Sequence, residues 1–276
     1  GRRRRRQARR RRHLVPVIVK ARDDLRQEQF ASQLVAQAAA ILRAAKVRAW
    51  LRPYEVVATG PDAGAIEAIP DTVSLDALRR NDPAFVTLRD FFERHFGGNN
   101  TTISLATARR NFVESLAPAC IVSYLLQLKD RHNGNILLDS RGRLVHIDFG
   151  YMLASSPGGN LGFEAAPFKL TRDFLDVVGP DHLRTFKDLC VQAFVALRAD
   201  RHRLILLAEM AAQGAAFLPC FDGRPRETLD AFRHRFRPDL PDRRCRAFVH
   251  SLIDKSINNW RTALYDTYQR RCVGIL

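Results

Sequence analysis

The sequence predicts an α+β fold in two lobes, a small strand-rich amino-terminal lobe and a larger, mainly helical carboxyl-terminal lobe. Up to about residue 70, short apolar runs alternate with turn-forming residues, which is typical of strands. After Asp71 the apolar residues recur at helical spacing instead. A hydrophobic content of 46% in 276 residues excludes a disordered chain and supplies the apolar side chains of a sizeable core.

An arginine-rich tract occupies residues 1–13. Residues 2–6 and 9–12 are nine arginines, more than half of the formal net charge of +16. The tract has neither helical periodicity nor interleaved aromatic rings, which favours a solvated low-complexity tail, with a membrane- or nucleic-acid-binding arm as the alternative. No nucleic-acid recognition motif accompanies the charge, so nucleic acid is not an expected partner. Because the chain begins with Gly1 rather than methionine, we expect it to be a fragment of a longer protein.

Residues 14–20 are predicted to form a strand, and Pro16 favours an edge position for it. A helix should follow, with Asp23 or Asp24 as its N-cap and a capping box closed by Gln27 or Glu28. Apolar residues at helical spacing predict that this helix buries one face, formed by Phe30, Leu34, Ala38, Ile41 and Leu42.

Lys20 ends the first strand, and Glu28 lies in the first turns of the helix that follows. We expect Glu28 to reach back to Lys20, because a lysine held in this way directs its ammonium group at phosphates. A surface salt bridge of little energetic value is the alternative.

Residues 53–59 and 64–69 are predicted to be two further strands, joined by a turn at 60–63. The boundary between the lobes is placed after Asp71, so that residues 14–71 form the first lobe and residues 72–276 the second. Residues 111–128 are predicted to form a helix that is kinked or split at Pro118.

The segment from Leu126 to Gly150 is expected to organise the chain. Two apolar runs, 136–138 and 144–147, flank the turn formers of 139–142 and predict a β-hairpin. The hairpin brings Asn135, which precedes it, to the same end as Asp148, which follows it. A carboxamide and a carboxylate facing each other form a hard-oxygen site suited to Mg²⁺ carrying phosphates.

The remainder is predicted to be an irregular functional loop, 151–168, followed by helices at 181–213 and 242–269. The loop around 218–221 and the basic stretch 224–241 are expected to separate these helices. The apolar carboxyl terminus is read as packed core, with a membrane contact as the alternative.

The five scattered cysteines, without a C-x-x-C pair, indicate a reduced, intracellular protein with no structural zinc site. We expect neither a signal peptide nor a membrane span, because no apolar run in these residues is long enough for either.

Three segments together carry a resemblance to a known family: VIVKARDDLRQE, KDRHNGNILLDSRGRLVHIDFG and SSPGGNLGFEAAPFKLT. From about Leu14 onward, the chain resembles the catalytic domain of the phosphatidylinositol 3-/4-kinase family, and within it the type III 4-kinases. The resemblance implies a two-lobed, protein-kinase-like fold with ATP in the cleft. It implies that Lys20 contacts the ATP phosphates with Glu28 as its partner, and that the backbone of Glu67, Ala68 and Ile69 is the hinge that meets adenine. The pocket would be lined by Tyr54, Leu137 and Ile147.

The resemblance also assigns the metal and the transfer site. Asn135 and Asp148 would hold Mg²⁺, or Mn²⁺ in its place, and Asp130 and His132 would act where the phosphoryl group is transferred. An imidazole has an ordinary pKa of about 6.5, so His132 is a plausible proton acceptor at neutral pH. Asp130 either orients it or takes the proton itself, and the sequence leaves both roles open, as it does a purely structural role for His132.

The predicted activation loop, 151–171, bears on the substrate. The 21 residues from Asp148 to Phe168 contain no lysine or arginine, whereas 45 such residues in 276 would predict about three. Recognition of extra ring phosphates needs clustered positive charge. The loop, followed by Lys169 as its first cation, therefore fits phosphatidylinositol with an unphosphorylated ring.

The expected function is a lipid kinase that phosphorylates the 4-hydroxyl of phosphatidylinositol at cytosol-facing membranes. The resemblance suggests the Golgi, and trafficking GTPases or adaptors as partners through regions outside this chain. One departure stands out: the family's glycine- and serine-containing phosphate loop, which precedes the lysine strand, has no counterpart here. The alternatives are therefore a phosphatidylinositol 3-kinase, a related protein kinase, or a catalytically impaired fragment or scaffold with an incomplete first lobe.

Overall fold

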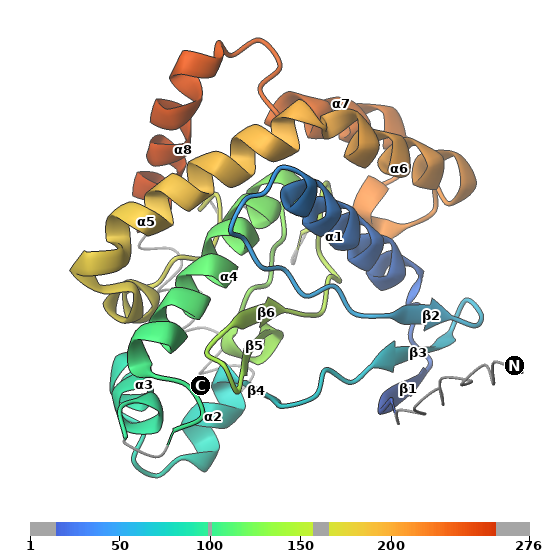
Figure 1. The fold of residues 1–276 in the computed structure, drawn as a ribbon. Helices are drawn as coiled ribbons and strands as arrows, with labels where there is room; N and C mark the ends of the chain where they lie inside the picture. The colour runs from blue at the N-terminus through green and yellow to red at the C-terminus, as the bar shows by residue number, and fades with distance from the viewer. Residues whose placement is uncertain (1–14, 99–100, 157–165, 258–276) are drawn as a thin grey trace, which may run out of the picture.

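The computed structural model describes residues 15–98, 101–156 and 166–257 (Figure 1). It has the predicted α+β character, with two small antiparallel sheets and a larger set of helices. The first sheet contains β1 (Val17–Ala21), β2 (Val56–Ala58) and β3 (Ala63–Glu67), in the order β1-β3-β2. The second contains β4 (Thr72–Ser74), β5 (Ile136–Asp139) and β6 (Leu144–His146), in the order β4-β5-β6.

The first sheet agrees with the prediction of an edge strand after Pro16, because β1 pairs with β3 alone among the described strands. Lys20 lies opposite Gly64 in that pairing. A side chain at Gly64 could not be accommodated, since its Cβ would lie 2.5 Å from the carbonyl oxygen of Val57. Every residue of β1 is exposed. The strand therefore holds Lys20 in place through backbone pairing rather than through burial.

Helix α1 (Arg26–Ala44) follows β1 and buries the predicted face. The predicted capping box is wrong, because the N-cap is Leu25 and neither Gln27 nor Glu28 closes a box, although the Asp24 carboxylate accepts the N–H of Arg26 at 3.1 Å. Asp24 instead forms a bidentate pair with Arg26, and Gln27 is directed into the protein interior. Helix α1 lies against β2 on one side and against two helices of the larger lobe, α5 and α6, on the other.

The second sheet contains the predicted hairpin. Strands β5 and β6 pair with Ile136 opposite His146, and Gly142 turns the chain with a φ of +79°, a conformation that favours glycine. The prediction of helices directly after Asp71 missed β4, which adds a strand to the hairpin by pairing with β5. The hairpin therefore supplies the central strand and one edge strand of a three-stranded sheet, which lies beside α4 (Figure 1).

Helix α4 (Leu105–Leu126) runs through the middle of the larger lobe and delivers the chain to the hairpin (Figure 1). It starts six residues before the predicted position and is neither split nor interrupted at Pro118. Proline has no N–H, so the carbonyl of Glu114 loses its helical donor. The N–H of Trp50 replaces that donor, at 2.8 Å from the Glu114 oxygen. A long-range bond thus satisfies the carbonyl that Pro118 leaves free.

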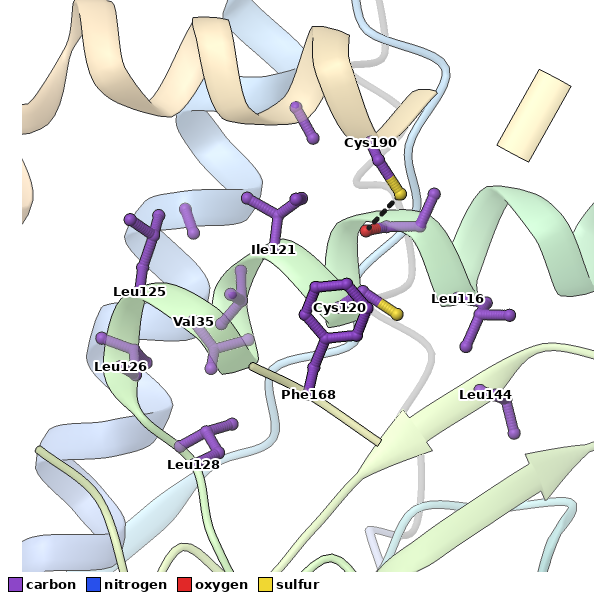
Figure 2. Packing of buried hydrophobic residues seen from close by; sticks show 14 of the residues in the cluster. Val35, Leu116, Cys120, Ile121, Leu125, Leu126, Leu128, Leu144, Phe168 and Cys190 are labelled. Carbon is purple, nitrogen blue, oxygen red and sulfur yellow. Dashed lines mark hydrogen bonds between the residues drawn. The ribbon is translucent and has the colours of Figure 1, made fainter. Parts of the chain in front are cut away.

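The core surrounds α4. Phe112 is fully buried and makes edge-to-face contacts with Phe92 and Phe174. Figure 2 shows the next turns of α4, where the Cys190 thiol donates to the Ala117 carbonyl at 3.7 Å. The described cysteines are all free and buried, while Cys272 lies outside the described residues. No helix in the described ranges is long and apolar enough to cross a membrane.

The remaining helices complete the larger lobe: α2 (Leu75–Asn81), α3 (Leu88–Phe96), α5 (Arg172–Ala199), α6 (Arg201–Gly214), α7 (Pro225–Arg235) and α8 (Asp242–Ile257). Helix α5 contains a break at Gly179, with a φ of +66°. The stretch 224–241, which was predicted only to separate two helices, contains helix α7. The whole arginine tract, residues 157–165 of the predicted functional loop, and the predicted continuation of the last helix from residue 258 to 269 lie outside the described residues.

Candidate active site

A cavity of about 330 Å³ lies between the first sheet, the start of α1 and the hairpin. It collects side chains from segments that are far apart in the sequence. Every residue predicted to bind the nucleotide or the metal lines it: Lys20, Glu28, Tyr54, Glu67, Ala68, Ile69, Asn135, Leu137, Ile147 and Asp148. The wall is completed by residues that were not predicted, among them Ile18, Gln27, Ile66 and Pro219.

The hairpin places Asn135 and Asp148 at one end of this cavity. The N–H of Ile147 donates to the carbonyl of Asn135 at 3.1 Å, which extends the β5–β6 pairing to the two predicted metal ligands. The Asn135 amide nitrogen donates to the Asp130 carbonyl at 2.9 Å, so its side-chain oxygen is the atom left for a ligand. A carboxylate and an amide oxygen fit Mg²⁺, which takes few protein ligands and completes its shell with phosphate and water. Asp148 itself has a φ of +60°.

Lys20 does not have the predicted partner. Its ammonium group donates to Asp23, at 3.0 Å, and this bond raises the pKa of Lys20. Asp148 and Glu28 contribute weaker attractions that raise it further, so Lys20 lies within their field although it bonds to neither. Both members of the Lys20–Asp23 pair are nearly half exposed. An exposed pair of this kind is weak, and Lys20 can exchange Asp23 for a phosphate at little cost.

Glu28 is instead bound to the segment that carries Asp148. It accepts hydrogen bonds from the Tyr54 hydroxyl and from the backbone N–H groups of Asp148 and Phe149. Burial raises the pKa of Glu28, and burial next to this carboxylate raises that of Tyr54. The Tyr54 ring also stacks on Phe149, with the centroids 6.0 Å apart. Glu28 and Tyr54 therefore fix the backbone on either side of Asp148, the predicted metal ligand.

Arg131 is a residue of the site that the sequence prediction missed. Its guanidinium is buried and donates to the carbonyls of Lys129, Ile147 and Asp148, at 2.8 Å and 2.7 Å for the first two. Burial lowers its pKa, while the surrounding carboxylates oppose that shift. Arg131 thus joins the loop before the hairpin to the segment after it. Its position between Asp130 and His132 was the available signal, but one arginine carries little information in a chain this basic.

Asp130 and His132 lie on the loop between α4 and β5, outside the cavity lining. Asp130 has a left-handed backbone with a φ of +59°. The Nδ1 atom of His132 accepts the N–H of Gly134 at 3.1 Å, which leaves Nε2 as the protonated nitrogen of the neutral ring. Burial lowers the pKa of His132, and the nearby Asp130 carboxylate opposes that effect.

Lys169 is the one predicted substrate-loop residue, and the structure places it beside this same loop. Its ammonium group donates to the Asn133 side-chain oxygen at 3.2 Å and is buried. Its charge contributes to the lowered pKa of His132. Lys169 therefore lies next to the transfer residues, although residues 157–165 of the predicted activation loop lie outside the described part of the chain.

The predicted hinge is partly engaged by neighbouring backbone. The N–H of Glu67 donates to Glu55, the N–H of Ala68 donates to the Pro16 carbonyl at 2.9 Å, and the Glu67 carboxylate pairs with Arg52. The N–H of Ile69 donates to no carbonyl within the described residues. Of the three hinge residues, Ile69 is thus the one with a backbone donor left for a ligand in the cavity.

Comparison with known proteins decides the family. The family model described as phosphatidylinositol 3- and 4-kinase matches residues 14–220, three quarters of the chain. The chain belongs to the phosphatidylinositol 3- and 4-kinase family. This confirms the resemblance seen in the sequence, and the two-lobed kinase-like fold agrees with it.

Curated relatives share extensive identity with this family member. Phosphatidylinositol 4-kinase beta 2 of Arabidopsis thaliana is 47% identical over 94% of this chain and 23% of its own length. The phosphatidylinositol 4-kinase of Dictyostelium discoideum is 42% identical over 95% of this chain and 22% of its own length. Phosphatidylinositol 4-kinase beta of Xenopus laevis is 41% identical over 95% of this chain and 32% of its own length. The chain thus spans between about a fifth and a third of these relatives.

Proposed function

We propose that this chain is the catalytic part of a phosphatidylinositol 4-kinase, which transfers the γ-phosphate of ATP to the 4-hydroxyl of phosphatidylinositol. The observation that carries the proposal is the cavity in which the predicted nucleotide and metal residues come together. The names of relatives that are 41–47% identical support the 4-hydroxyl over the 3-hydroxyl as the acceptor. The same names speak against a protein kinase.

In this proposal the nucleotide enters the cavity with adenine toward the hinge. The N–H of Ile69 donates to the base, and Tyr54, Leu137 and Ile147 contribute to the walls. Lys20 leaves Asp23 for the phosphates, and Asn135 and Asp148 hold Mg²⁺ or Mn²⁺. The ion would neutralise charge on the phosphates. Glu28 acts through the backbone of Asp148 rather than through Lys20.

The transfer residues divide the proton chemistry between them. Because the Gly134 N–H occupies Nδ1 of His132, the neutral imidazole presents an N–H donor at Nε2. We assign hydrogen-bond donation to His132 and proton acceptance from the inositol hydroxyl to Asp130. A weak base suffices, because the hydroxyl proton leaves late in a loose phosphoryl-transfer transition state. Lys169, beside His132, adds a positive charge for the transferred group.

The absence of positive charge from most of the predicted activation loop bears on the substrate. No lysine or arginine occurs between Asp148 and Phe168, which favours an inositol ring without further phosphates. We propose that the enzyme acts at cytosol-facing membranes as a peripheral protein, with the Golgi as one site and with trafficking GTPases or adaptors bound by regions outside this chain.

The boundary between the two lobes is proposed at residues 71 and 72, between β3 and β4, each of which belongs to a different sheet.

The test is a lipid kinase assay on this chain. Labelled ATP, Mg²⁺ and phosphatidylinositol vesicles are incubated with the protein, and the lipid products are separated by head-group isomer. The 4-phosphate is expected, and Asp148→Asn is expected to abolish its formation. The matched control is Asp239→Asn, at an exposed aspartate far along the chain, which should leave activity unchanged. A 3-phosphate product would contradict the assigned acceptor, and the absence of any Asp148-dependent product would contradict catalysis by this chain.

A further inference from the structure

Gln27 occupies an unusual position in the first turn of α1. Its side chain is buried, with 5% of its surface exposed. Its amide nitrogen donates to the carbonyls of Phe149 and Gly150, at 3.0 Å and 2.6 Å, and its amide oxygen accepts the N–H of Cys220 at 2.7 Å. One side chain therefore bonds to backbone segments that are more than 120 and more than 190 residues away in the sequence.

The two segments form different parts of the candidate active site. Phe149 and Gly150 directly follow the metal ligand Asp148, and Pro219, the neighbour of Cys220, lines the cavity. Gln27 lies next to Glu28, which bonds to the N–H groups of Asp148 and Phe149. Adjacent residues of α1 thus hold the same segment from both sides, Glu28 through its N–H groups and Gln27 through its carbonyls.

The chemistry of the site requires an amide. The three backbone partners present two acceptors and one donor, and a glutamine side chain offers two N–H donors and one carbonyl oxygen. A glutamate could accept from Cys220 but could not donate to either carbonyl. A methionine of similar length could do neither. Buried backbone groups without a partner are costly, so the local structure depends on this one residue.

We propose that Gln27 is a positioning residue that couples the Asp148 end of the cavity to its Pro219 wall. This inference rests on the proposed kinase function, because the role given to Gln27 is to position parts of that site. Gln27 itself makes no contact with the reacting atoms. It acts through Asp148, whose orientation determines where the metal lies, and through Pro219, whose position sets the width of the cavity. Loss of Gln27 releases both segments at once.

The experiment compares three variants: Gln27→Met, Gln27→Glu and, as a matched control, Gln29→Met. Gln29 is on the same helix and accepts the Ala58 N–H at 3.0 Å, so its loss removes an amide bond to β2 and none to the candidate site. Amide hydrogen exchange is measured at residues 147–152 and 218–222. Michaelis constants for ATP and turnover on phosphatidylinositol vesicles are measured in parallel, together with melting temperatures.

Gln27→Met is expected to speed exchange at least tenfold in both segments, to lower turnover at least tenfold and to raise the Michaelis constant for ATP. Gln27→Glu retains the Cys220 bond, so exchange should rise at 147–152 while Cys220 stays protected, and turnover should fall more than ATP affinity. Gln29→Met should change none of these beyond twofold.

The proposal is overturned if Gln27→Met and Gln29→Met behave alike, or if Gln27→Glu disturbs both segments equally. Should Gln27→Met fail to fold, the segment-specific pattern of Gln27→Glu decides the matter. Amide hydrogen exchange can be measured whether or not the protein phosphorylates lipid. If no variant and no wild-type protein phosphorylates lipid, the proposed function fails while the coupling of the two segments is still judged by exchange.

Discussion

Replacement of Arg131 with methionine should destabilise the protein and remove its activity. The methionine fills much of the space of the arginine stem but leaves the carbonyls of Lys129, Ile147 and Asp148 without their donors. Each unpaired buried carbonyl costs about 1–3 kcal/mol. Part of that cost is offset because the guanidinium, whose pKa is lowered by burial, no longer has to be desolvated. We expect a net loss of about 3 kcal/mol, a large fraction of the roughly 5–15 kcal/mol of a typical domain.

Urea unfolding measures this loss. At an unchanged slope of about 3 kcal/mol per molar, the midpoint should fall by about 1 M. Arg131→Lys, which retains some of the donors, should lose about half as much. Arg79→Met is the control, because Arg79 pairs with Asp173 at 2.7 Å in a partly exposed position and should cost about 1 kcal/mol or less. Equal midpoints for Arg131→Met and Arg79→Met would refute the role given to Arg131.

Four further predictions concern the same loop and its neighbours. Asp148→Asn should abolish the Mg²⁺-dependent rise in melting temperature on addition of ATP, because one of two metal ligands loses its charge; an undiminished rise would place the ion elsewhere. Tyr54→Phe should cost about 1–2 kcal/mol in urea unfolding, since Glu28 loses a donor and the Asp148 N–H an acceptor while the ring stacking remains. Because burial lowers the pKa of His132, the ring should remain neutral at a more acidic pH than an exposed histidine does, and the decline of kcat/KM on acidification should be shifted in the same direction. Asp130→Asn should reduce turnover by at least about 100-fold and His132→Asn by less; the reverse order would make His132 the base.

Local patterns predicted those parts of the site that lie close together in the sequence. The hairpin and the juxtaposition of Asn135 with Asp148 follow from two apolar runs and a turn, all within about 14 residues. The buried face of α1 follows from helical periodicity in the same way. The family resemblance supplied the hinge and the predicted pocket walls, which come from distant segments and share no local pattern.

Two of the differences between the predictions and the structure involve partners that are distant in the sequence. Glu28 was expected to bind Lys20, but the N–H groups at 148 and 149, some 120 residues away, occupy it instead. Pro118 was expected to kink or split its helix; α4 is not split there, and the N–H of Trp50 supplies the donor that the Glu114 carbonyl loses.

Helix α7 was missed for a different reason. Its proline, Pro225, lies in the first turn, where the missing N–H costs nothing, and it buries few side chains, so the sequence shows little periodicity.

Helix α1 has a consequence for how the protein unfolds. It follows the lysine strand, yet its buried face packs against α5 and α6, and its residues belong to the same continuous core as those of α4. The two lobes therefore share one set of buried apolar side chains, and neither can lose its structure without exposing part of the other. Heating or denaturant should accordingly melt both in a single cooperative step, and a cut between β3 and β4 should yield two pieces that are each unable to fold alone.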